Sequence, residues 1–195
     1  MEAETALDPM ALFAAWMQDA AASELNDPNA VALATASGEG VPNVRMVLMK
    51  GVDGRGFAFY TNAESAKGVE LGENPRAAMC FHWKSLRRQV RISGTVAELP
   101  AGDADGYFHS RSRRSQLGAV ASQQSRVLAS REVLEARVKE LEAEFPGEIP
   151  RPAYWKGYVL RPEWIEFWKD GAARLHDRFL FTRAGDGWRR ERLFP

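Results

Sequence analysis

The segment Arg174-Leu175-His176-Asp177-Arg178 carries the clearest chemistry in the sequence. In an extended strand, successive side chains point to opposite faces, so Arg174, His176 and Arg178 are expected to share one face. Three such polar groups are costly on a half-buried strand without an anionic partner. A solvated strand face is the alternative, because charged residues are mostly exposed. Aromatic residues on both sides of the segment favour burial, and therefore an anion or cofactor site.

Other segments also combine Arg or Lys with hydroxyl or amide side chains. They are residues 44–50, 59–67, 87–91 and 107–116. Arginine forks and hydroxyl groups are the side chains that proteins use to hold phosphate oxygens. Together the segments predict a pocket that can hold more than one phosphate.

The segment 107–116 contains one pattern with a geometric reason behind it. Tyr107 and Arg111 are four residues apart, so on a helix they share a face, and Ser115 continues that face. This spacing predicts one anion site. A solvated basic face is the alternative interpretation, because Arg113 and Arg114 lie beside these residues.

The composition excludes several classes of protein. The chain has 195 residues and a net charge of zero, so its cations suit a small anionic ligand better than nucleic acid or a membrane surface. It contains no apolar run of bilayer length and no signal peptide, and we expect a cytoplasmic protein. Cys80 is the only cysteine, which excludes an internal disulfide, and its apolar neighbours predict a core thiol. The three histidines are far apart, so we assign no metal.

The elements that must position these groups are mainly short strands joined by turns. Strands are predicted at residues 31–35, 44–50, 57–61, 77–83, 89–99, 154–160, 164–169, 178–182 and 188–193. Helices are predicted after Asp8, after Ser65 and after Ser130, and with breaks over 101–125. This order favours an antiparallel barrel over a doubly wound sheet. No repeat or domain boundary is evident, so we expect a single domain over residues 1–195, with 1–7 as a flexible tail.

A set of separated motifs resembles the pyridoxamine 5′-phosphate oxidase family. The motifs occur in the family's order, from about Asp8 to Pro195, and many must agree at once. They are Arg45-Met46-Val47-Leu48-Met49-Lys50, Phe59-Tyr60-Thr61-Asn62, Arg88-Gln89-Val90, Tyr107-Phe108-His109-Ser110-Arg111, Ser115-Gln116-Leu117-Gly118-Ala119, Gln124-Ser125, Ile165-Glu166-Phe167-Trp168 and the segment 174–178.

The resemblance implies a mainly β fold with helices, the antiparallel FMN-binding split β-barrel, assembled as a homodimer. It implies oxidation of pyridoxamine 5′-phosphate and pyridoxine 5′-phosphate to pyridoxal 5′-phosphate, a step of pyridoxine biosynthesis. Dioxygen would be the electron acceptor, and hydrogen peroxide would be released. FMN would supply the redox chemistry, while the protein would position the substrate.

The resemblance also assigns residues to the cofactor and the substrate. The expected FMN-binding residues are Arg45, Met46, Val47, Leu48, Met49, Lys50, Tyr60, Thr61, Lys67, Gln89, Gln124, Ser125, Trp168 and Arg178. The expected substrate-binding residues are Asp27, Lys50, Tyr107, Arg111, Ser115, Arg174, Leu175 and His176. Among these, Arg174 and His176 would hold the pyridine ring and are the expected catalytic residues.

Some features depart from the family's pattern, and two other functions stay open. Ala66 stands where a basic residue is usual, Ala172 and Ala173 replace bulkier or polar residues, and the N-terminus lacks a segment that can close over the substrate. One alternative is another split-barrel flavin oxidase of the phenazine type. The other is a non-catalytic carrier of FMN or pyridoxal phosphate.

Overall fold

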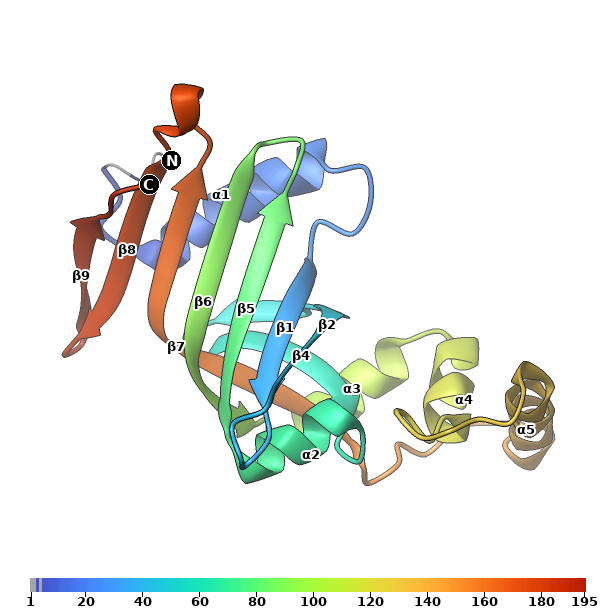
Figure 1. Cartoon of the computed structure of the whole chain (residues 1–195). Helices are drawn as coiled ribbons and strands as arrows, with labels where there is room; N and C mark the ends of the chain where they lie inside the picture. Colours follow the sequence, from blue (N-terminus) through green and yellow to red (C-terminus); the bar gives the residue numbers. More distant parts are fainter. Residues whose placement is uncertain (1–2, 4) are drawn as a thin grey trace.

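The protein is built on one antiparallel sheet. The computed structural model describes residue 3 and residues 5–195. Within them, nine strands pair in the order β2-β1-β5-β6-β7-β4-β3, and β8 and β9 extend the sheet from β7 (Figure 1). The strands are β1 (Ala30–Ala36), β2 (Pro42–Leu48), β3 (Gly51–Asp53), β4 (Gly56–Asn62), β5 (Arg76–Trp83), β6 (Arg88–Glu98), β7 (Trp155–Lys169), β8 (Asp177–Ala184) and β9 (Gly187–Arg192). The expected mainly β, antiparallel fold with helices is confirmed.

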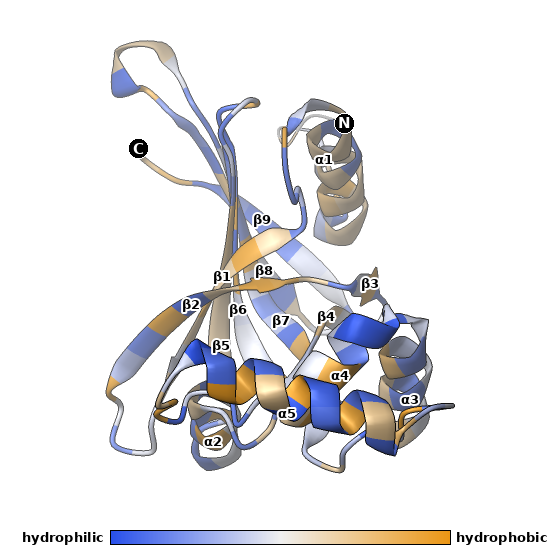
Figure 2. Ribbon diagram, turned by 90° about the vertical axis from the view of Figure 1, so that its right-hand side faces the viewer, coloured by the Kyte–Doolittle hydropathy of each residue, from blue (hydrophilic) through white to orange (hydrophobic). Residues whose placement is uncertain are grey.

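The helices lie outside this sheet. They are α1 (Pro9–Ser23), α2 (Ala66–Glu73), α3 (Ala101–Ser110), α4 (Arg113–Ala121), α5 (Arg131–Glu144) and a short 3-10 turn, η1 (Ala172–Arg174). Helix α1 covers one face of the sheet, whereas α3, α4 and α5 project together from its lower end (Figure 1). Hydrophilic and hydrophobic residues alternate along α5, as expected for a helix that buries one side (Figure 2).

The predicted cap residues begin two of these helices. The Asp8 carboxylate accepts a hydrogen bond from the backbone N–H of Met10 at 2.9 Å, and Pro9 fills the first helical position. Ser65 caps α2 in the same way, since its hydroxyl accepts from the Gly68 N–H at 3.4 Å. The second cap begins the helix that carries Lys67, one of the expected FMN-binding residues.

The main core lies between α1 and the sheet. Phe13 meets Phe57 edge-on with ring centroids 4.9 Å apart, and Trp16 meets Phe167 at 5.2 Å. These rings are almost fully buried. A second, smaller cluster joins α3, α4 and α5 to the start of β7 and contains Trp155. The helical layer is therefore anchored to the sheet beside the beginning of β7.

One expectation about the chain path was wrong. Residues 154–160 and 164–169 were predicted as separate strands, but β7 runs through both, with Pro162 as an interruption between them. A bulge at Ser93/Gly94 absorbs the interruption, and a Cβ on Gly94 would lie 1.9 Å from the Arg161 carbonyl oxygen. The expected flexible tail over residues 1–7 stays a prediction, and residues 1, 2 and 4 of it lie outside the described part of the chain.

Part of that N-terminal segment is packed against the sheet. Ala3 and Ala6 are 7% and 4% exposed. Arg190 on β9 donates a hydrogen bond to the Ala6 carbonyl at 3.0 Å. In the described part of this segment, two small apolar side chains are therefore buried and one carbonyl is hydrogen-bonded to the sheet.

Candidate active site

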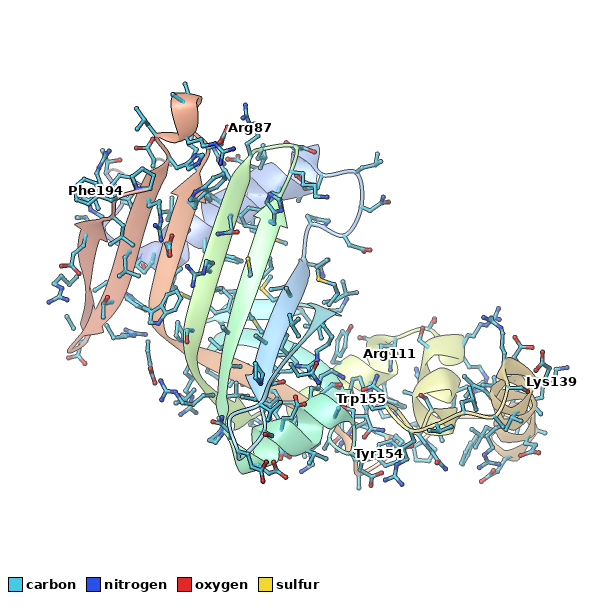
Figure 3. The ribbon with its side chains drawn as sticks, viewed as in Figure 1. Arg87, Arg111, Lys139, Tyr154, Trp155 and Phe194 are labelled. Carbon is cyan, nitrogen blue, oxygen red and sulfur yellow. The ribbon has the colours of Figure 1, made fainter. Side chains whose placement is uncertain are left out.

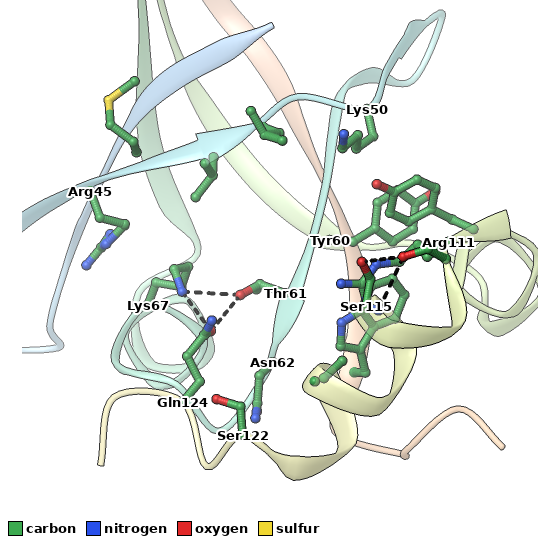
Figure 4. A pocket seen from close by; sticks show the side chains of 18 residues that line it. Arg45, Lys50, Tyr60, Thr61, Asn62, Lys67, Arg111, Ser115, Ser122 and Gln124 are labelled. Atoms are coloured by element: carbon green, nitrogen blue, oxygen red, sulfur yellow. Dashed lines mark hydrogen bonds between the residues drawn. The ribbon is translucent and has the colours of Figure 1, made fainter. Parts of the chain in front are cut away.

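A cavity of about 910 Å³ opens where β2 and β4 face the helices α2, α3 and α4 (Figure 4). Many of the predicted site residues line it. They are Arg45, Met46, Val47, Leu48, Lys50, Tyr60, Thr61, Lys67, Tyr107, Arg111, Ser115 and Gln124. Figure 4 shows their polar side chains in two groups, one around Lys67 and one around Arg111. The structure thus brings together segments that are far apart in the sequence.

The first group centres on the ammonium of Lys67, which is only 7% exposed. It donates hydrogen bonds to Gln124 Oε1 at 3.0 Å, Thr61 Oγ1 at 3.2 Å and Ser65 Oγ at 3.3 Å. Burial lowers the pKa of Lys67, and the nearby Arg45 lowers it further, while Glu70 acts in the opposite direction. A buried cation with uncharged partners is well suited to receive an anion.

Arg45 belongs to the same end of the cavity but is already paired. Its guanidinium lies 3.0 Å from the Glu70 carboxylate and also donates to the Thr35 hydroxyl. Burial alone would raise the pKa of Glu70, but hydrogen bonds from Thr35, Asn43 and Arg45 hold it below its usual value. Glu70 is a site residue that sequence reasoning missed; its position one helical turn after Lys67 is the signal that could have found it.

The second group contains Lys50, Tyr107, Arg111 and Ser115. The predicted continuous helical face is wrong, because α3 ends at Ser110 and α4 begins at Arg113. Ser112 caps the new helix and its hydroxyl lies 2.8 Å from that of Ser115. The break turns the chain so that the residues on either side of it still line one cavity.

Arg111 is the most unusual side chain of this group. Its Nη1 atom is buried and has no hydrogen-bond partner among the described residues. The guanidinium lies over the ring of Trp155, 5.2 Å from the centroid. Burial lowers the pKa of Arg111, with Tyr107 acting in the opposite direction. A buried N–H without an acceptor is costly, which favours an oxygen of a bound ligand as its partner.

Three other predicted residues lie outside the cavity lining. Met49 is 6% exposed and packs in the main core. Ser125 has a positive φ of 73° and accepts a hydrogen bond from the Ala66 N–H at 3.2 Å, so it fixes the loop that carries Gln124 to the start of α2. Asp27 is a turn residue with a φ of 41° before β1.

The remaining predicted residues gather at the opposite end of β6 and β7. They are Gln89, Trp168, Arg174, Leu175, His176 and Arg178. Gln89 pairs with Trp168 in the sheet, whereas the cavity residue Tyr60 pairs with Gly157 at the other end of β7. In Figure 3, Arg87 and Phe194 mark this upper end, far from Arg111 and Trp155. Within one chain the two sets do not form one pocket.

The predicted strand face of Arg174, His176 and Arg178 is also wrong. Arg174 belongs to η1 and has a φ of 64°, and β8 begins only at Asp177. A tight loop causes the difference, because a Cβ on Gly171 would lie 2.0 Å from the Leu175 carbonyl oxygen. His176 Nδ1 accepts from the Gly171 N–H at 3.2 Å, and the same nitrogen lies 3.2 Å from Asp170.

Arg178 is tied to a buried carboxylate. Its Nε donates to Glu166 Oε1 at 2.8 Å, and Arg91 reaches the other oxygen of Glu166 at 3.0 Å. The hydrogen bond to Glu166 raises the pKa of Arg178. Its Nη1 also donates to the Phe194 carbonyl at 2.9 Å. Glu166 and Asp170 were missed as partners of the predicted residues, because pairing across strands and loops is not visible in sequence spacing.

Two features are absent from the described part of the chain. No cluster of His, Cys, Asp and Glu among these residues has the geometry to hold a metal ion. No helix within the same residues is long and apolar enough to cross a membrane.

Comparison with known proteins matches both parts of the chain. The family model described as "Pyridoxamine 5'-phosphate oxidase" matches residues 17–145, and the one described as "Pyridoxine 5'-phosphate oxidase C-terminal dimerisation region" matches residues 155–195. A protein of Gluconobacter oxydans named pyridoxine/pyridoxamine 5'-phosphate oxidase is 59% identical over 96% of this chain and 94% of its own. The similarly named protein of Brucella anthropi is 58% identical over 96% and 94%.

Two solved structures share the fold of this chain. The crystal structure of PhzG from Burkholderia lata, in complex with tetrahydrophenazine-1-carboxylic acid, superposes with a TM-score of 0.93 at 34% identity, covering 98% of this chain and 94% of that one. An FMN-binding protein from Nostoc punctiforme, at 18% identity and a TM-score of 0.78, covers 98% of this chain and 100% of its own and shares the fold. The chain therefore belongs to the pyridoxamine 5′-phosphate oxidase family.

Proposed function

We propose that the protein oxidises pyridoxamine 5′-phosphate and pyridoxine 5′-phosphate to pyridoxal 5′-phosphate, with FMN as cofactor and dioxygen as electron acceptor. The observation that carries the proposal is one cavity with two separate cationic groups, around Lys67 and around Arg111. FMN has one phosphate and so does the substrate. The names of relatives at 58–59% identity support the same reaction.

The group around Lys67 fits the FMN phosphate. Lys67 is buried with uncharged hydrogen-bond partners, and Arg45 stands beside it on β2. A cavity of about 910 Å³ is within the size range of cofactor sites. Arg45, Thr61 and Lys67 would hold the phosphate, while Tyr60 and Gln124 would meet the rest of the cofactor. The backbone of residues 46–50 runs along the same side.

The group around Arg111 would hold the substrate phosphate. The unpartnered Nη1 of Arg111 supplies a donor, and Tyr107, Ser115 and Lys50 line the same part of the cavity. Bound FMN supplies a ring that accepts a hydride from the exocyclic carbon bearing the amine or hydroxyl. Holding the phosphate fixes this carbon relative to the ring, and positioning of this kind contributes much of a catalyst's rate.

The proposal includes a homodimer, because the expected catalytic residues Arg174 and His176 do not reach the cavity of their own chain. These residues, with Leu175, Gln89, Trp168 and Arg178, lie at the end of β7 away from the cavity. The region 155–195 matches a dimerisation region of the family. A second copy would bring its own distal residues to the cavity of the first, so that each site is completed by both protomers.

The proposal also covers the domain organisation and the cellular location of the protein. We expect the chain to act as a single domain in the cytoplasm, where its one cysteine would stay reduced. Cell fractionation of the native host tests the location.

The function is tested by mixing the purified, FMN-loaded protein with pyridoxamine 5′-phosphate in air. Formation of pyridoxal 5′-phosphate together with an equal amount of hydrogen peroxide is expected. A parallel reaction with tetrahydrophenazine-1-carboxylic acid tests the phenazine-type alternative. Oxidation of the phenazine but not of the phosphorylated pyridine would contradict the proposal, and binding of FMN without turnover of either compound would point to a carrier.

A further inference from the structure

Three aromatic rings support the Arg111 group of the cavity, and one of them has no role so far. Tyr60, Tyr107 and Trp155, here called the aromatic shelf, are nearly parallel. Tyr60 and Tyr107 have centroids 4.2 Å apart, Tyr60 and Trp155 5.5 Å, and Tyr107 and Trp155 5.9 Å. Tyr60 and Tyr107 are already expected to touch cofactor and substrate, whereas Trp155 is the unassigned member.

Trp155 is fixed firmly in place. It is the first residue of β7 and is 6% exposed. Phe108 of α3 meets its ring edge-on at 5.2 Å. The carbonyl of Trp155 accepts a hydrogen bond from Arg151 Nη1 at 2.6 Å. The indole is therefore a rigid surface between the sheet and the helices that carry the second cationic group (Figure 3).

The two cations of the second group, Arg111 and Lys50, each lie over a ring of the aromatic shelf. The guanidinium of Arg111 lies 5.2 Å from the centre of the Trp155 ring, and Lys50 Nζ lies 5.9 Å from that of Tyr107. A ring face attracts a cation without accepting a conventional hydrogen bond. Arg111 is thus held by the ring while its buried Nη1 keeps no partner among the described residues. A carboxylate in the same place would hold the arginine but would also neutralise it.

We propose that Trp155 is a positioning residue that holds Arg111 unpaired for the phosphate of the substrate, and so helps to select phosphorylated over unphosphorylated pyridines. The inference rests on the proposed function for the identity of the ligand. The inference concerns one effect only: the Trp155 ring acts through Arg111 on binding of the substrate phosphate.

Binding is measured with 4-deoxypyridoxine 5′-phosphate, which has no group to oxidise, by titrating the FMN-loaded protein and following flavin absorbance. Trp155→Leu should weaken binding of this ligand about two- to thirty-fold, the range of a cation–π contact. Trp155→Phe keeps a ring and should lie closer to the wild type. Neither change should alter binding of unphosphorylated 4-deoxypyridoxine, which is measured at saturating FMN.

A double-mutant comparison separates positioning from a structural role. In protein that already carries Arg111→Ala, Trp155→Leu should cause no further loss of phosphate-ligand affinity, because the group through which Trp155 acts is gone. If Trp155→Leu does not fold, fluorinated tryptophan incorporated into the wild type and into Arg111→Ala weakens the ring's attraction for cations instead. Fluorination should lower the affinity for 4-deoxypyridoxine 5′-phosphate in the wild type but not in Arg111→Ala.

Three results would overturn the role of Trp155. They are unchanged affinity in Trp155→Leu, equal losses for the two ligands, and additive losses with Arg111→Ala. None of these depends on turnover. A wild type that binds the phosphorylated ligand through Arg111 and Trp155 but does not oxidise pyridoxamine 5′-phosphate would contradict the proposed function and leave this inference standing.

Discussion

The Lys67 ammonium and the Gln124 side-chain carbonyl lie 3.0 Å apart and join α2 to the loop after α4. This contact closes one end of the cavity and places a buried cation against an uncharged partner. Under the proposed function, the cation would exchange this amide contact for one to the FMN phosphate. The arrangement explains why a positive group is buried here, and it leads to the first two predictions.

Replacing Lys67 should weaken FMN binding. Lys67→Met removes the buried cation while keeping most of the side-chain volume. A charge-assisted hydrogen bond contributes about 1.5–3 kcal/mol, so the dissociation constant should rise about ten- to a hundred-fold. Quenching of FMN fluorescence measures it. Lys139→Met, on the exposed face of α5, is the matched control and should bind like the wild type. Equal affinity in both variants would remove Lys67 from the cofactor site.

The same substitution should not destabilise the FMN-free protein. Burial is the main reason why the pKa of Lys67 lies below 10.5, so the folded chain binds fewer protons than the unfolded chain between the two pKa values. The cost of the buried charge is present below the folded pKa and is relieved as pH rises towards 10.5.

Denaturant unfolding of the FMN-free proteins checks the direction of this pH dependence of stability. At neutral pH the free energy of unfolding of Lys67→Met should equal or exceed that of the wild type. The difference in free energy of unfolding between the two proteins should shrink as pH rises from the folded pKa of Lys67 towards 10.5. A variant that is clearly less stable at neutral pH, with no dependence on pH, would mean that the hydrogen bonds of Lys67 outweigh its desolvation.

Substitutions at Arg174 and at Arg178 should affect different ligands, the substrate and FMN respectively. Arg174→Ala should lower the catalytic efficiency while FMN stays bound, because Arg174 is assigned to the substrate ring. Arg178→Ala should weaken FMN retention, and it also leaves Glu166 with Arg91 as its remaining paired cation in the described structure. Gel filtration followed by flavin spectra and kinetics checks both. Equal loss of flavin in the two variants, restored in both by added FMN, would contradict this division.

Mixed dimers should show whether two chains build each site. Arg111→Ala and Arg174→Ala should each be nearly inactive at low substrate concentration. In a dimer of one chain of each kind, one site carries both changes and the other carries neither. Co-expressed chains, purified through two different tags, should therefore recover about half of the wild-type activity per dimer. No recovery would mean that Arg111 and Arg174 act within one chain.

The sequence predicted the sheet better than the site. The strands predicted at 57–61 and 77–83 and the caps at Asp8 and Ser65 depend on local sequence, and the structure follows them. The strand face of Arg174 and Arg178 failed because a close backbone approach at Gly171 decides the loop, and no neighbouring residue signals it. Such contacts depend on the tertiary fold.

The missed site residues share one property. Glu70, Glu166 and Trp155 act on predicted residues from other elements, through an ion pair or a ring contact. Sequence spacing identifies residues that share one helix or strand, but not pairs formed between elements. Arg111 was predicted as a substrate-binding residue, but its position over Trp155 and its buried, unpartnered nitrogen are known only from the structure.

The most direct measurement is a single turnover without air. FMN-loaded protein is mixed anaerobically with pyridoxamine 5′-phosphate, and flavin absorbance and product are followed together. The account predicts loss of the oxidised-flavin band, about one pyridoxal 5′-phosphate per bound FMN, and return of the band on admission of air. Arg111→Ala should need about ten- to a hundred-fold more substrate to reach half of the wild-type bleaching rate. A flavin that dithionite reduces but pyridoxamine 5′-phosphate leaves oxidised at every concentration would contradict the account.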